Sequence, residues 1–253
     1  MKYAPAWYAS PIALPESSSG KIQIRHRIIE AGEKVSIIGM RQAFLRGLRP
    51  TRGLLSEPLL VHELVHKNHG IWMTDLPEEL NQIEELLFGI KPAGRVLIGG
   101  LGLGILATRV ASLPDVEEVT VVEIDKDIIK LCEDDIDCLV VNADIVEYLH
   151  TTEERYDYYL LDTWQGTNEG TWWEEVMPMR RLIRHRCGTK PVVHCWAEDI
   201  MQGQILGALT TKPPHWYTKH LPVLMCEKEA RSFLRNVGWP SWERKYGKAV
   251  DKA

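Results

Sequence analysis

A glycine-rich loop between an apolar strand and a helix constrains the fold of this chain more than any other segment. Residues 95–98 read as a short buried strand, and the loop at residues 99–104 follows directly and leads into a helix. Glycines let the backbone turn tightly and approach a ligand closely. The amides at the start of the next helix favour an anionic group. The loop therefore predicts a ligand site, and a plain strand-to-helix turn is the alternative.

Strands and helices alternate from residue 74 onward. The first helix is expected to begin at Thr74 or Asp75, with Pro77 in its first turn. Apolar strands separated by helices are typical of a parallel sheet with both faces covered. Right-handed crossovers make this a doubly wound, mostly parallel, Rossmann-like α/β domain. After the glycine loop, we expect strands at 119–123, 139–141, 156–162 and 191–196, and helices at roughly 104–112, 126–135, 144–150, 171–186 and 198–209.

The segment before residue 74 has a different texture. Residues 1–20 hold three prolines and a serine run, which predicts an extended, flexible arm. Residues 21–73 alternate polar and apolar side chains between glycine-containing turns, which predicts a small N-terminal antiparallel β unit. At 253 residues the chain allows one large domain with a small companion. We therefore assign residues 74–253 to the Rossmann-like domain, with weaker patterns for a strand at 215–225 and a helix at 227–237.

Three carboxylates stand where strands of the expected sheet end. Glu123 ends the second strand, about 20 residues after the loop, where it can accept hydrogen bonds from both hydroxyls of a ribose. Asp144 follows the third strand and could accept from an adenine amino group while Ile145 lies against the ring; capping the next helix is the equal alternative. Asp162 ends the fourth strand, beside the loop, and would face the reactive end of a bound ligand.

Together these segments resemble the class I S-adenosylmethionine-dependent methyltransferases, and most closely their spermidine synthase-like branch, over about residues 58–165. The resemblance implies S-adenosylmethionine or its decarboxylated form as cofactor. It also implies that the glycine loop holds the methionine part, that Glu123 holds the ribose, and that Asp144 and Ile145 hold the adenine. The residues expected to bind the cofactor are therefore Gly100, Gly102, Gly104, Glu123, Ile124, Asp144 and Ile145.

The expected reaction is group transfer to a small molecule or a peptide. Asp162 would orient or deprotonate the acceptor, and Trp164 would shape its pocket. The spermidine synthase-like branch has a second aspartate where this chain has Gln165, which supplies no charge to pair with an ammonium group. We therefore favour a methyltransferase over an aminopropyltransferase, which stays open as an alternative. A third possibility is a protein that binds the cofactor without turnover.

Two other motifs point to different chemistry. His62, Glu63 and His66 match the zinc-protease pattern H-E-x-x-H, which requires a helix. Alternation around them predicts a strand, on which two histidines four residues apart stand about 13 Å from each other and could not share one zinc. Residues 102–107 also fit the G-x-G-x-x-A loop of NAD-dependent oxidoreductases. The carboxylates after the third and fourth strands argue against that alternative, since hydride transfer needs neither.

Composition bounds the partners and the compartment. The formal net charge is −5, so nucleic acid is not the expected partner. Five cysteines without a close C-x-x-C pair argue against a disulfide framework or a four-cysteine zinc site, and fit a reducing, cytoplasmic compartment. No apolar run has the length of a membrane helix, and no secretion leader is evident. We expect no metal and no membrane partner, and a homodimer through strand edges of the N-terminal unit is possible.

Overall fold

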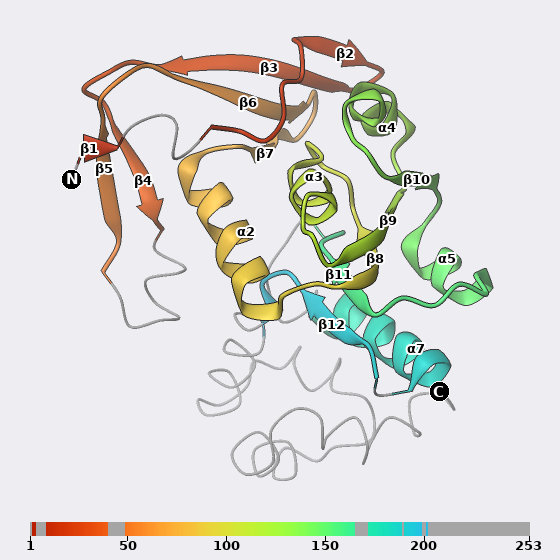
Figure 1. Cartoon of the computed structure of the whole chain (residues 1–253). Coiled ribbons are helices and arrows are strands. Elements are labelled where there is room, and N and C mark those ends of the chain that lie inside the picture. Colours follow the sequence, from red (N-terminus) through yellow and green to blue (C-terminus); the bar gives the residue numbers. More distant parts are fainter. Residues whose placement is uncertain are drawn as a thin grey trace, which may run out of the picture. The chain divides into compact units, whose positions relative to one another are not determined.

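The computed structural model describes residues 2–3, 9–39, 49–164, 172–188, 190–198 and 201 (Figure 1). The chain divides into two compact units. The first comprises residues 1–163 with 190–193, and the second comprises residues 164–189 with 194–253. The boundary expected at residue 74 therefore lies inside the first unit. The strand expected at 215–225 and the helix at 227–237 lie outside the described residues, as does most of the helix at 198–209.

A five-stranded sheet confirms the expected doubly wound α/β fold. Its strand order is β10-β9-β8-β11-β12, so successive strands run outward from β8 first on one side and then on the other. The pairs β10·β9, β9·β8 and β8·β11 are parallel. The central strand is fully covered, since Val96, Leu97 and Ile98 are at most 1% exposed. The strands are β8 (Gly94–Gly99), β9 (Val116–Glu123), β10 (Leu139–Asn142), β11 (Tyr158–Leu161) and β12 (Val192–Cys195).

Short helices connect these strands and flank the sheet (Figure 1). They are α3 (Ile105–Ala111), α4 (Lys126–Cys132) with the short 3-10 turn η2 (Glu133–Asp135), and α5 (Ile145–Thr151). Aspartates cap two of them, because the Asp125 side chain accepts from the Asp127 amide and Asp144 accepts from the Val146 and Glu147 amides. In the second unit, the π-helical turn η3 (Trp172–Val176) leads into α7 (Met177–Cys187) within the expected helix.

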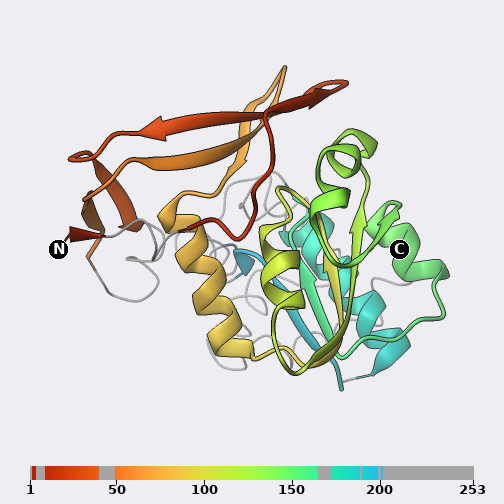
Figure 2. The ribbon, with the colours of Figure 1, turned by 45° about the horizontal axis from the view of Figure 1, so that its top comes forward.

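Helix α2 (Pro77–Ile90) precedes the sheet and lies beside α3 (Figure 2). Its start differs from the sequence expectation. The N-cap is Leu76, with no side-chain cap, rather than Thr74 or Asp75. Both side chains have other partners: the Thr74 hydroxyl donates to Glu79, and the Asp75 carboxylate accepts from His62.

The N-terminal segment forms two small, mainly antiparallel sheets, as the alternating pattern predicts. The first has the order β2-β3-β6-β7, and its strands are β2 (Ser17–Ser19), β3 (Ile22–Ile29), β6 (Leu59–His66) and β7 (Gly70–Thr74). The second has the order β1-β5-β4, with β1 (Lys2–Tyr3), β5 (Thr51–Leu55) and β4 (Lys34–Ile38); here β1 is parallel to β5.

Residues 1–20 were expected to form a flexible arm, but their described part includes a paired strand and buried side chains. Ser17–Ser19 pair with β3, and Leu14 is 1% exposed. The Ser19 hydroxyl also donates to Asp127 Oδ1 over 2.7 Å, at the start of α4. Burial of Ile12 and Leu14 offsets the conformational entropy that this segment loses when it becomes ordered. The proline content of the segment does not predict this burial.

None of the helices in the described ranges combines the length and the apolarity that crossing a membrane requires.

Candidate functional site

The glycine loop leaves β8 in a conformation that suits glycine alone. Gly100, Gly102 and Gly104 have φ values of 92°, 54° and 77°, in the left-handed region that side chains disfavour. The loop is fastened to both neighbouring strands. The Gly100 amide donates to the Val122 carbonyl of β9, and the Asp162 amide, just after β11, donates to the Gly99 carbonyl, each over 2.9 Å. A Cβ at Gly100 would clash with the Asp162 carbonyl oxygen.

Glu123, the last residue of β9, bonds directly to the loop. Its Oε2 accepts from the Leu101 amide and its Oε1 from the Asp125 amide, each over 2.8 Å. The residue is 7% exposed. Each carboxylate oxygen has a second lone pair, so two acceptor positions are left after these bonds. The two amides therefore fix the orientation of a carboxylate that can still accept hydrogen bonds from a diol.

Ile124, the residue that follows Glu123, has an exposed apolar side chain. Ile124 is 67% exposed, although it is a large apolar residue. Asn142, at the end of β10, donates through Nδ2 to the Glu123 and Ile124 carbonyls, at 3.0 and 3.1 Å. The turn that presents Ile124 is thus held by a side chain of the neighbouring strand.

Asp144 and Ile145 lie at the start of α5. One oxygen of Asp144, Oδ1, accepts from the Val146 and Glu147 amides at 2.8 and 3.1 Å, so the capping role that the sequence allowed is present. Asp144 is exposed, whereas Ile145 is buried, close to Gly99. Ile145 therefore packs under the strand end instead of lying open beside it.

Asp162 is exposed immediately after β11, and sequence reasoning missed an acidic neighbour. Glu79, on the first turn of α2, accepts from the Thr74 amide and hydroxyl, each over 3.2 Å. Burial, together with the negative charge of Asp162, raises the pKa of Glu79 to about 7. The pattern of charged residues on the helix did not predict this, because the electrostatic interaction joins two segments more than 80 residues apart. The two carboxyl groups make this side of the loop acidic.

Two sulfur side chains also contact the loop and were not predicted. The Leu103 amide lies 3.4 Å from the Met73 sulfur, and a side chain at Gly102 would meet that same sulfur. The Cys132 thiol donates to the Gly102 carbonyl over 3.5 Å. Burial raises the pKa of Cys132 to about 12, so this thiol is neutral at physiological pH and is no nucleophile. Met73 ends up here because β7 brings the N-terminal sheet to the loop.

Trp164 belongs to the second unit. Its indole N–H donates to the Trp196 carbonyl over 3.1 Å, and the residue is 8% exposed. In the same unit, Glu198 accepts from Arg180 and from the Trp172 indole. The structure thus brings the glycine loop, Glu123 and Asp162 together at the ends of β8, β9 and β11, while Trp164 packs among residues of its own unit.

The zinc-protease alternative is excluded by the geometry of its motif. His62, Glu63 and His66 lie on strand β6, as the alternation predicted. His62 Nδ1 bonds to Asp75 Oδ2 over 2.6 Å, and Glu63 pairs with Arg27. Within the described ranges, no three histidine, cysteine or acidic side chains are grouped so that they could hold a metal ion.

No protein-family model matches the chain, and no curated protein matches its sequence. Similar solved structures include a SAM-dependent methyltransferase from Archaeoglobus fulgidus, at 21% identity over 45% of this chain and 47% of that chain, with a TM-score of 0.34. A dimethyladenosine transferase from Plasmodium falciparum matches at 19% identity over 42% of this chain and 37% of its own, with a TM-score of 0.32. An N-methyltransferase from Bradyrhizobium japonicum matches at 14% identity over 48% and 72%, with a TM-score of 0.32.

The match thus spans less than half of this chain and less than half of each of the first two structures.

Proposed function

We propose that this protein is an S-adenosylmethionine-dependent transferase that moves a methyl group to a small-molecule or peptide acceptor. One observation carries the proposal. At the point where the strand order reverses, beside β8, a left-handed glycine loop lies between a buried carboxylate at the end of β9 and an exposed one after β11. Open α/β sheets bind their ligands at this point, outside the carboxyl ends of the strands.

The residues present suit a nucleoside with a charged tail. Glu123 has two acceptor positions left for the ribose hydroxyls, and its orientation is set before any ligand arrives. Gly100, Gly102 and Gly104 present backbone where a Cβ would meet a neighbouring group. Exposed Ile124 offers an apolar surface for a purine ring, and Asp144 has one oxygen, Oδ2, not used by its cap.

Glu79 and Asp162, here called the acidic pair, suit the acceptor. S-adenosylmethionine supplies a methyl group on a positively charged sulfur. As the acceptor lone pair forms the new bond to carbon, the sulfur–carbon bond breaks with its electrons left on sulfur, and the acceptor must lose a proton. Asp162 is exposed, so its carboxyl group can orient the acceptor; Glu79, with a pKa of about 7, can take or hold that proton.

One assay distinguishes methyl transfer from the two alternatives, aminopropyl transfer and binding without turnover. The full-length protein is mixed with acceptor pools of amines, thiols and carboxylates, and with either S-adenosylmethionine or its decarboxylated form. We expect methylated products and S-adenosylhomocysteine from the first cofactor. Aminopropylated products from the second would contradict methyl transfer, and no product with either, despite binding, would contradict catalysis.

The adenine contact is tested by a matched pair of surface substitutions. Ile124→Ser should weaken S-adenosylmethionine binding about tenfold, since it removes a large part of the apolar area that would cover the purine. Phe88→Ser is the control, because Phe88 is 80% exposed on α2. Both variants should melt within a few degrees of the parent protein. Equal affinity of the two variants, measured by calorimetry, would contradict the placement of the adenine at Ile124.

A further inference from the structure

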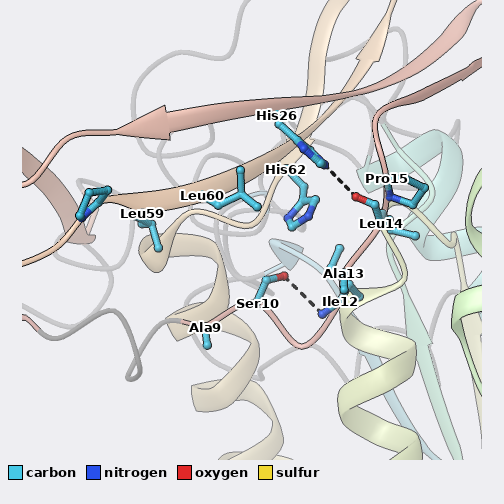
Figure 3. Close-up of a pocket in the computed structure, with 11 residues that line it drawn as sticks. Ala9, Ser10, Ile12, Ala13, Leu14, Pro15, His26, Leu59, Leu60 and His62 are labelled. Atoms are coloured by element: carbon cyan, nitrogen blue, oxygen red, sulfur yellow. Dashed lines mark hydrogen bonds between the residues drawn. The ribbon is translucent and has the colours of Figure 1, made fainter.

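A pocket of about 440 Å³ lies on the N-terminal β unit, apart from the glycine loop (Figure 3). Residues 9–15 cross one face of the β3–β6 pair and form one wall, while β6 and the residue before it form the other. This volume is within the range of small-molecule sites, which are mostly apolar with a few well-placed polar groups. The apolar lining includes Ile12, Ala13, Leu14, Pro15, Leu59 and Leu60.

A histidine–aspartate pair supplies the polar group. His62 lines the pocket and is 4% exposed. Its Nδ1 lies 2.6 Å from Asp75 Oδ2, and its backbone amide donates to Asp75 Oδ1 over 2.7 Å. Asp75 itself is 2% exposed. A carboxylate only accepts, so Nδ1 donates to Asp75, and in the tautomer with its proton on Nδ1 the ring presents a lone pair at Nε2. Among the residues that the structure describes, Nε2 has no hydrogen-bond partner.

A second histidine fixes the position of the first. His26 is the register partner of His62 across β3 and β6, and their rings meet edge to face with centroids 4.9 Å apart. His26 Nε2 donates to the Leu14 carbonyl over 2.8 Å, which also ties the covering segment to the sheet (Figure 3). Ser10 is similarly engaged, since its hydroxyl accepts from the Ile12 amide at 3.4 Å.

We propose that this pocket binds a small, uncharged organic molecule with an apolar body and a single hydroxyl or N–H donor, which bonds to His62 Nε2. The chemistry follows from what the pocket offers. Burying a hydrocarbon group against the apolar walls is favourable in free energy. In the tautomer with its proton on Nδ1, His62 Nε2 faces a donor in the pocket as a hydrogen-bond acceptor. The pocket lining holds no lysine or arginine that would select an anion.

This site would be independent of the transfer reaction, because its residues belong to the N-terminal strands and the segment before them. It nevertheless adjoins the acidic pair in sequence: Asp75 follows Thr74, which donates to Glu79. Failure of the pocket proposal would therefore leave the proposed methyl transfer untouched, and the reverse also holds.

The test uses phenol and toluene, which have the same shape but differ in the donor. The intact protein, labelled with 15N at histidine, is titrated with each compound. We expect phenol to shift the Nε2 resonance of His62 saturably, and toluene to leave that nitrogen unchanged. An Nε2 resonance that phenol does not move, or that toluene moves equally, would overturn the proposal.

A matched pair of substitutions locates the binding. Leu60→Trp should block the pocket and weaken phenol binding at least tenfold, because Leu60 lines it and is 46% exposed. Ile28→Trp is the control: Ile28 is the register partner of Leu60 and is 61% exposed, but it does not line the pocket. Both positions are at the surface, so both variants should fold. The same affinity for phenol in the two variants would place the binding elsewhere and contradict the proposal.

Discussion

Glu123 has a structural role and a proposed ligand-binding role, and the sequence alone does not distinguish between them. It accepts from the amides of Leu101 and Asp125, so it holds the glycine loop against the end of β9. In the proposed function it also accepts from the ribose. A carboxylate can do both, since its two oxygens offer about four lone-pair sites. The first role requires two acceptor oxygens, which a glutamine does not have.

Glu123→Gln tests this arrangement. The amide NH2 would face either the Leu101 or the Asp125 N–H, and one buried donor would be left without an acceptor. We expect a loss of about 1–3 kcal/mol in the free energy of unfolding, measured with denaturant. Affinity for S-adenosylmethionine should fall at least tenfold, whereas Asp162→Asn should leave affinity within about threefold and lower turnover about 100-fold or more. Equal affinity losses in the two variants would contradict these roles.

Glu79 makes the stability depend on pH in an unusual direction. Its ordinary value is 4.5, and in the folded protein burial raises the pKa to about 7. Between these values the folded state binds the proton and the unfolded state has lost it, so stability falls as the pH rises from about 4.5 to 7. The loss is up to about 3 kcal/mol and is complete above the folded pKa.

Glu79→Gln should remove this dependence, since the amide has no proton to lose and can still bond to Thr74. We expect the difference in unfolding free energy between variant and parent to grow in favour of the variant from pH 5 to pH 8. Denaturant unfolding at a series of pH values measures it. A constant difference across that interval would show that Glu79 titrates normally.

At the scale of elements, the glycine loop depends on the close approach of two strand ends. Gly100 has a φ of 92° and faces the Asp162 carbonyl oxygen, whereas Gly32 has a φ of 88° with nothing within 4 Å of an added Cβ. The two positions share the backbone strain and differ in the contact.

Gly100→Ala should therefore destabilise the protein by several kcal/mol more than the roughly 1–3 kcal/mol strain that Gly32→Ala shares with it. Thermal unfolding of the two variants makes the comparison. Similar melting temperatures would mean that the loop relaxes easily, which contradicts a rigid seat for a cofactor.

Local patterns predicted the elements of the parallel sheet well. β8, the loop and α3 are each specified by neighbouring residues, so apolar runs and glycines locate them within a residue or two. The start of α2 was missed because Thr74 and Asp75 resemble capping residues in sequence but bond to Glu79 and His62 instead. Burial of Leu14 was missed because the local pattern of prolines and serines around it does not predict a buried side chain.

At the scale of the whole molecule, the candidate site combines segments of the N-terminal part of the chain with segments of the parallel sheet. The ends of β8, β9 and β11 were predictable, because parallel strands end at one edge of a sheet. Met73 was not, because β7 reaches the loop through tertiary packing, and Glu79 was not, because its electrostatic interaction with Asp162 joins distant segments. Trp164 belongs to the second unit, and its expected role in shaping the acceptor pocket stays a prediction.

The central claim is that the crevice beside β8 binds an adenosyl sulfonium compound. Isothermal titration calorimetry of the full-length protein against S-adenosylmethionine and NAD tests it most directly. The account predicts saturable heat with S-adenosylmethionine, at least tenfold weaker binding in Glu123→Gln, and no heat with NAD. Binding of NAD alone, or no heat with either compound, would contradict it.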